Sequence, residues 1–166
     1  MNSLQNLMEA MLRWERGCPQ RAQHLIKVHS FARWIGLSEG LEPETLRTLE
    51  AAALVHDIGI RPALEKYASS AGPLQEREGP APAAELLSRA GFEAERIDRV
   101  CHLVAHHHTY EGVDGPDWRI LLEADYLVNA FEGEHHREAI LAARENIFRT
   151  ETGRRMLTEM FDLPEA

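Results

Sequence analysis

The stretch that decides the fold is Ala51-Ala52-Ala53-Leu54-Val55-His56-Asp57-Ile58-Gly59. The residues before the His-Asp pair are apolar on every side of a helix, which is typical of a buried central helix. We expect this helix to open near Pro43 and to end near Gly59, with that glycine as its C-cap. A carboxylate at the end of a buried helix is costly unless it is paired or bound to a metal. His56 and Asp57 are therefore candidate site residues, unless the helix surfaces here and both side chains are solvated.

A second acidic residue lies on an apolar stripe further along the chain. Asp125 occurs in Leu121-Leu122-Glu123-Ala124-Asp125-Tyr126-Leu127-Val128. Its helical neighbours four and three residues before it and three residues after it are apolar, whereas Glu123 lies off this stripe. A carboxylate that faces a core needs a partner, which is either the proposed site or an arginine.

Two histidines in the segment 20–37 compete for the same site. His24 shares a helical stripe with Val28, Phe31 and Ile35. His29 is rotated from it by about 140° at 3.6 residues per turn. His24 is therefore the better inward candidate, although either residue could be a core histidine bonded to a backbone carbonyl.

The rest of the chain also has helical spacing, and no stretch alternates apolar and polar residues over strand length. We predict one all-α domain over residues 1–166, a compact bundle of about seven to nine helices. Its motif-bearing core spans about residues 21–129, and a helical C-terminal extension covers 134–161. The segment 69–82 is rich in Gly, Pro and Ser and is expected to be a loop that could fold over the site. Further helices are expected over 83–90, ending at Gly91, and over 93–108.

These segments together carry a family pattern. Arg21-x-x-His24-x-x-x-Val28-x-x-x-Ala32 is followed by His56-Asp57-Ile58-Gly59 and then by Ala124-Asp125. The pattern resembles the HD superfamily of metal-dependent phosphohydrolases over about residues 21–129. The resemblance implies a helical fold and a metal-ligand set of His24, His56, Asp57 and Asp125.

The chemistry of this set explains its composition. Two imidazoles and two carboxylates form a roughly neutral site for a divalent cation with positions open for water. Such an ion lowers the pKa of a bound water toward neutrality and neutralises charge on phosphoryl oxygens. The expected cofactor is therefore a divalent metal cation, with Mn, Mg, Fe, Ni, Co and Zn all compatible with the sequence.

A second metal is suggested by Val100-x-x-Leu103-Val104-x-x-His107-His108, which resembles the helix that supplies extra histidines in dinuclear branches of the superfamily. His107 is the expected inward ligand and His108 the reserve. The other histidine of those branches has no counterpart, and we expect Glu78 to replace it or to orient water or substrate. Alternatively, His106 to His108 form a solvated helix end that complements the helix dipole. The predicted catalytic residues are His56, Asp57, Glu78 and His107.

Four cations are candidates for binding phosphate, although the interpretation as an ordinary surface charge is favoured for each. They are Arg21, Lys27, Arg61 and Lys66.

Composition excludes several other classes of protein. The chain has 18 Lys and Arg against 27 Asp and Glu, a net charge of −9, which argues against nucleic acid and anionic membranes as partners. The longest uncharged apolar run, 51–55, is too short to span a bilayer, and no signal-peptide pattern opens the chain. Two cysteines without a CxxC pair favour a reducing cytoplasm.

The resulting expectation is a cytoplasmic phosphohydrolase that cleaves a phosphoester of a nucleotide or another small phosphorylated metabolite with metal-activated water. Two alternatives remain open at this point. One is a di-iron oxygenase on the same scaffold, as found in a minority of the superfamily, and the other is a metal- or nucleotide-binding module without turnover.

Overall fold

The computed structural model describes residues 3–165, which form ten α-helices and no strand. The all-α prediction is thus confirmed for this part of the chain, and residues 1, 2 and 166 of the predicted domain lie outside it. None of these helices combines the length and the apolar character that crossing a membrane requires. The helices are α1 (Ser3–Trp14), α2 (Pro19–Ser38), α3 (Pro43–Val55), α4 (Ile60–Tyr67), α5 (Gly72–Glu78), α6 (Pro80–Ala90), α7 (Ala94–Val104), α8 (Pro116–Glu132), α9 (Arg137–Asn146) and α10 (Glu151–Met160).

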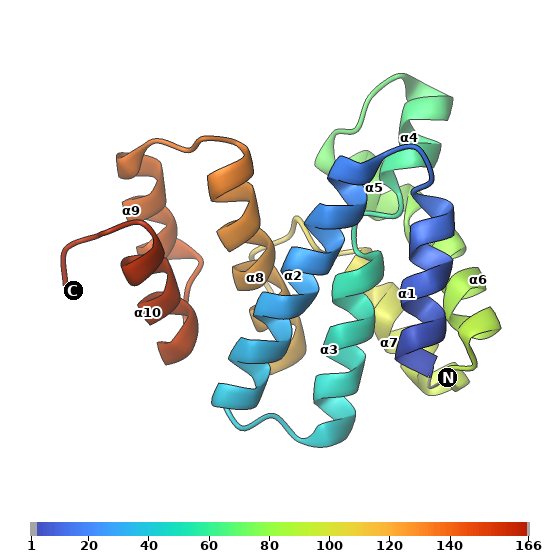
Figure 1. Cartoon of the computed structure of the whole chain (residues 1–166), viewed down its shortest axis with the longest axis horizontal. Coiled ribbons are helices and arrows are strands. Elements are labelled where there is room, and N and C mark those ends of the chain that lie inside the picture. The colour runs from blue at the N-terminus through green and yellow to red at the C-terminus, as the bar shows by residue number, and fades with distance from the viewer. Residues whose placement is uncertain (1–2, 166) are drawn as a thin grey trace.

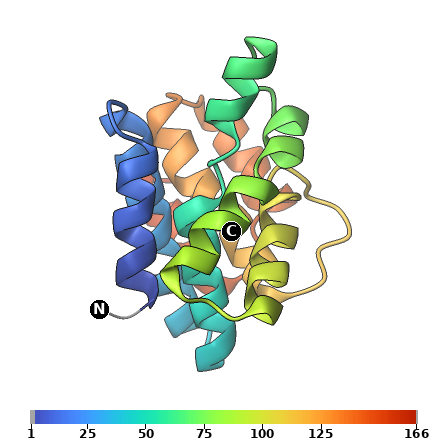
Figure 2. The same ribbon diagram turned by 90° about the vertical axis from the view of Figure 1, so that its right-hand side faces the viewer.

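Helix α3 lies at the centre of the bundle (Figure 1). It packs against α1, α2, α7 and α8, while α2 also packs on α8. Helices α6 and α7 pack on each other, and α9 and α10 lie at the far end of the long axis from α1 and α6. The turned view shows α4 and α5 near one another on the same side of the molecule (Figure 2), and the two helices are in contact. Helix α3 and the segment that follows it are thus surrounded by other helices, with α2, α7 and α8 all packed on α3.

The apolar run on α3 is buried as its composition predicts. Each residue from 51 to 55 is at most 1% exposed, because the helix has neighbours on every side. Helix α8 is also largely buried, and its apolar residues join the same core. Burial of this kind is the main favourable term in folding, at about 25 cal/mol for each Å² of apolar surface.

The end of α3 differs from the prediction. The helix ends at Val55, and residues 56–59 form a turn rather than a last helical turn capped by Gly59. Gly59 has a φ of −71°, which any residue can adopt. The glycine is required by close packing instead, since an added Cβ would lie 2.4 Å from the backbone oxygen of Gln75 and 2.8 Å from the nitrogen of Gly79.

Two further boundaries also differ from the prediction, while a third agrees. The expected loop 69–82 contains α5, whose first turn accommodates Pro73 and which packs on α4. The expected helix 93–108 ends at Val104, and residues 105–108 form a turn. Helix α6 ends at Gly91 as predicted, because that residue has a φ of +87°, which glycine adopts without strain.

The burial of Glu123 on α8 is not predicted by the helical spacing of its apolar residues. It lies off the stripe of Asp125, yet it is fully buried against the link between α9 and α10. Its carboxylate accepts hydrogen bonds from the backbone N–H of Arg149 at 2.6 Å, the backbone N–H of Thr150 at 3.0 Å and the hydroxyl of Thr150 at 2.5 Å. This side chain helps to attach the C-terminal helices to the core, together with apolar residues such as Phe148 and Leu157.

We expect Glu123→Ala to lower the free energy of unfolding by about 2–4 kcal/mol, because two backbone donors and the Thr150 hydroxyl lose the buried carboxylate that accepts from them. Urea unfolding followed by circular dichroism measures the change. Glu159→Ala, at an exposed position on α10, is the matched control and should change stability by less than about 0.5 kcal/mol. Equal losses in the two variants would show that Glu123 is not the attachment point.

Candidate metal centre

The structure brings together the four residues predicted as metal ligands, which are called the first cluster below. The Nε2 atom of His24 lies 3.1 Å from Asp125 Oδ1, 3.4 Å from Asp57 Oδ2 and 3.4 Å from His56 Nε2. The Nε2 atom of His56 lies 3.3 Å from Asp125 Oδ1 and 3.5 Å from Asp57 Oδ1. Potential ligand atoms of His24, His56 and Asp57 all lie within 4.8 Å of one another, which is compatible with a single ion.

Three separate segments supply the first cluster. His24 projects from α2, the His56-Asp57 pair from the turn after α3, and Asp125 from α8. The packing of α2 and α8 on α3 therefore determines the spacing of the ligand atoms. His24, His56 and Asp125 are all buried, so the site is held by core packing rather than by surface loops.

The imidazoles of the site are oriented by the bonds that their other nitrogens make. Nδ1 of His24 donates to Glu132 Oε2 at 2.8 Å, and Nδ1 of His56 donates to the Ala53 carbonyl at 3.0 Å. A carbonyl or an ionised carboxylate only accepts, so the proton of each neutral ring is on Nδ1. The Nε2 atoms that face one another therefore carry lone pairs, which is the arrangement found in metal-bound histidines.

The pKa values of the first cluster show that its two carboxylates are stabilised by positive charge. Burial opposes the charged form of His56, but Asp57 and Asp125 outweigh it and raise the pKa of His56 to about 9. Burial opposes ionisation of Asp57, but His56 and His107 lower its pKa to about 2. Asp125 has a pKa far below its ordinary value because His56 and His24 more than offset its burial. When no metal is bound, a proton on His56 balances part of the charge of the two ionised carboxylates, and a divalent cation would take the place of that proton.

A second cluster shares Asp57 with the first. It consists of Asp57, His107 and His108, whose potential ligand atoms also lie within 4.8 Å of one another. Nε2 of His107 lies 3.2 Å from Asp57 Oδ1, and Nδ1 of His107 donates to the Val104 carbonyl at 2.6 Å. Both histidines that the sequence suggested for a second ion thus reach the site. His106 does not, since its Nδ1 donates to the His102 carbonyl and its ring packs near Trp118.

Glu78, the predicted carboxylate of the second site, is not among the residues that the structure brings there. It is the last residue of α5, and its carboxylate pairs with Lys66 and accepts from the Tyr67 hydroxyl at 2.9 Å. Arg77 lies against it as well, at 3.3 Å. The residue of α5 that reaches the second cluster is Gln75, which precedes Glu78 by three residues and is buried.

Each candidate phosphate-binding cation already has an acidic partner. Arg21 Nε bonds Glu15 at 2.8 Å and Arg61 lies 4.0 Å from the same carboxylate, while Lys66 pairs with Glu78. Lys27 Nζ lies 2.5 Å from Glu132 Oε1. Lys27 is thereby connected to His24 through a single carboxylate, a link that the sequence alone does not reveal.

Sequence reasoning missed two contributors, Glu132 and Gln75. Glu132 follows Asp125 by seven residues on α8, so both lie on one side of that helix, and this spacing could have indicated it. Gln75 gives no such signal because it lies in the segment expected to be a loop. His29 behaves as expected: its Nε2 contacts Glu50 at 3.1 Å, outside both clusters.

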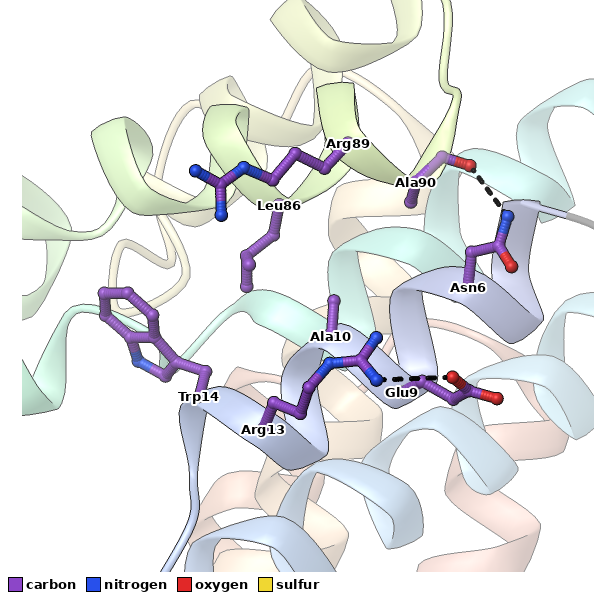
Figure 3. A pocket seen from close by; sticks show the side chains of 8 residues that line it. All are labelled: Asn6, Glu9, Ala10, Arg13, Trp14, Leu86, Arg89 and Ala90. Atoms are coloured by element: carbon purple, nitrogen blue, oxygen red, sulfur yellow. Dashed lines mark hydrogen bonds and ion pairs between the residues drawn. The ribbon is translucent and has the colours of Figure 1, made fainter.

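A surface pocket of about 670 Å³ lies elsewhere, between α1 and α6 (Figure 3). Its charged side chains are already paired, Arg13 with Glu9 and Arg89 with Glu85. None of the residues that line it belongs to either cluster. This pocket is therefore separate from the candidate metal-binding residues.

We expect metal affinity to increase with pH. The raised pKa of His56 stabilises the metal-free fold below about pH 6.5, and this contribution is lost as pH rises through about 9. A metal ion displaces that proton, so its affinity should rise about tenfold per pH unit for each proton released. Calorimetric titration with Mn²⁺ at pH 6.5, 7.5 and 8.5, in buffers of different ionisation enthalpy, counts the protons. Affinity that is independent of pH would contradict the proton–metal exchange.

We also expect Glu132→Ala to weaken metal binding by about 10–100-fold, the usual effect of removing the outer partner of a metal-bound histidine. Glu132→Gln, which keeps an oxygen acceptor for His24 Nδ1, should recover most of that loss. Glu50→Ala breaks a similar carboxylate–histidine pair at His29 and should leave the metal dissociation constant unchanged. The same loss in the Glu50 and Glu132 variants would mean that general destabilisation is responsible.

Comparison with known proteins agrees with the resemblance seen in the sequence. A model of the HD domain family matches residues 21–158, which extends past the predicted core into α10. No curated protein matches the chain. Among solved structures, the chain is similar to a predicted HD superfamily hydrolase from an uncultured Thermotogales bacterium, with 23% identity, a TM-score of 0.71, and coverage of 97% of this chain and 86% of that one. That likeness shows the common helical fold, and because the family match spans most of the chain, the protein belongs to the HD domain family.

Proposed function

We propose that this HD domain protein is a metal-dependent phosphohydrolase that cleaves a phosphoester of a nucleotide or another small phosphorylated metabolite. The observation that carries the proposal is the first cluster, in which His24, His56, Asp57 and Asp125 converge with their lone pairs facing one another. The description of the Thermotogales neighbour as a predicted hydrolase agrees with this assignment.

The four residues of the first cluster would hold the ion. A divalent cation bound there would supply Lewis acidity toward a phosphoryl oxygen and would lower the pKa of a coordinated water. The protein's own contribution is orientation, since Glu132 and the Ala53 carbonyl fix the rings of His24 and His56. Pre-set ligands reduce the reorganisation that binding and catalysis require.

Arg21 and Arg61 support phosphate as the substrate group. Arg21 precedes His24 by one helical turn, and Arg61 follows Asp57 by four residues. Glu15, whose side chain is fully buried, lies against both guanidinium groups. A guanidinium offers five N–H donors, so the bonds to Glu15 leave others for a phosphate.

We expect Asp57→Ala to lower the rate of phosphoester hydrolysis by more than about 100-fold, since it removes a ligand oxygen and outer partners alone account for about 10–100-fold. The measurement is phosphate release from a panel of nucleoside monophosphates and sugar phosphates with Mn²⁺, Co²⁺ or Mg²⁺ added. His29→Ala changes a histidine outside the clusters and should retain activity within about threefold of the parent. Metal-dependent release that survives unchanged in Asp57→Ala would refute the assignment.

An oxygenase on this scaffold gives a different outcome in a parallel measurement. Protein loaded with Fe²⁺ is exposed to air, and its visible absorption is recorded before and after a phosphorylated substrate is added. The proposed hydrolase should release phosphate without consuming O₂. Consumption of O₂ together with no phosphate release from any substrate of the panel would favour the oxygenase.

A further inference from the structure

Gln75 lies in the second cluster in a fixed orientation. Its Oε1 lies 3.3 Å from His107 Nε2 and 3.1 Å from His108 Nε2. Its amide nitrogen donates to the Ser70 carbonyl at 2.6 Å, which only an N–H can do. The carbonyl oxygen of the amide is therefore the atom that faces the two imidazoles, and only 8% of the residue is exposed.

The Nε2 atom of His107 faces two oxygen acceptors. Its Nδ1 carries the proton that is donated to Val104, so Nε2 of the neutral ring offers only a lone pair. That lone pair faces two further acceptors, Asp57 Oδ1 at 3.2 Å and Gln75 Oε1 at 3.3 Å. Acceptors that converge in a buried position are a ligand set for a cation, and without one only His108 Nε2, 3.1 Å from Gln75 Oε1, is placed to donate to that oxygen.

The residue after Gln75 on α5, Glu76, also contacts the segment that carries the two histidines. Glu76 Oε1 accepts the backbone N–H of His108 and the hydroxyl of Thr109, both at 2.9 Å. Consecutive residues of α5 thus fix the turn that carries His107 and His108. The donor atoms are positioned by the fold, in the way that metal sites require.

We propose that Gln75 Oε1 is a ligand of a second divalent cation, held together with Asp57, His107 and His108, and that Gln75 sets the affinity and metal preference of that site. This inference rests on one part of the proposed function, namely that the first cluster binds the first metal ion. An amide oxygen is neutral and harder than imidazole, and the only carboxylate is shared between the clusters. The second ion is therefore bound more weakly than the first, with Mn²⁺ favoured over Zn²⁺ relative to a site with a third histidine.

Equilibrium dialysis with Mn²⁺, combined with electron paramagnetic resonance, tests this without any assay of turnover. The parent protein should bind two ions per chain, the second more weakly, with the spectrum of two coupled Mn²⁺ ions at saturation. Gln75→Leu removes the carbonyl oxygen and should weaken the second ion by about tenfold or more while changing the first by less than about threefold. Gln75→His should keep two ions and shift the second site toward Zn²⁺.

The controls separate this site from the first cluster and from misfolding. His24→Ala should lose the tighter ion and retain the binding at Gln75. If Gln75→Leu fails to fold by circular dichroism, Gln75→Glu provides the test, because the added charge should tighten the second ion. One Mn²⁺ per parent chain at saturation, or a second ion unaffected by all three Gln75 variants, would overturn the inference. Two ions without phosphatase activity would refute the proposed function and leave the role of Gln75 intact.

Discussion

The carboxylates of Asp57, largely buried, and of Asp125, buried, lie where α2, α3 and α8 meet, and the site depends on the positive charges that balance them. Buried anions are stable only beside cations, and the nearest groups able to take a positive charge are the imidazoles of His24, His56 and His107. The pKa values of the two acids are lowered and that of His56 is raised because each group stabilises the other. A metal ion and a set of protons are alternative solutions to the same electrostatic problem, so metal binding, pH and stability are linked in this protein.

The glycine of the His-Asp-Ile-Gly stretch connects this centre to α5. Gly59 allows the backbone near Gln75 and Gly79 to approach closely, and Gly79 in turn leaves room for Val104, whose Cγ1 lies 2.6 Å from where a Cβ would be. Helix α5 is thereby pressed against the turn after α3 on one side and the turn after α7 on the other. The position of Gln75 beside His107 follows from this packing. The close backbone packing at Gly59 and Gly79 therefore also positions the residues of the second cluster.

The groups that hydrogen-bond to the candidate ligands differ in charge between the two clusters. On the first cluster, Glu132 orients His24 and at the same time holds Lys27, so a charge change at this carboxylate alters both the metal ligand and a neighbouring cation. On the second cluster, backbone carbonyls and α5 side chains provide the orientation, and they carry no net charge apart from Glu76. The first cluster therefore has the stronger electrostatic coupling to its surroundings.

The sequence by itself determined the helical class, the burial of residues 51–55 and the inward positions of His24 and Asp125, because helical periodicity is a local property that one segment records on its own. The tertiary structure alone decided that Gln75 and not Glu78 reaches the second cluster, that Glu132 contacts His24 from 108 positions away, and that Glu123 is buried. These outcomes depend on which helices pack together and how closely the Gly59 and Gly79 backbones approach. Local spacing does not record such distances, since they arise only when segments far apart in the chain meet.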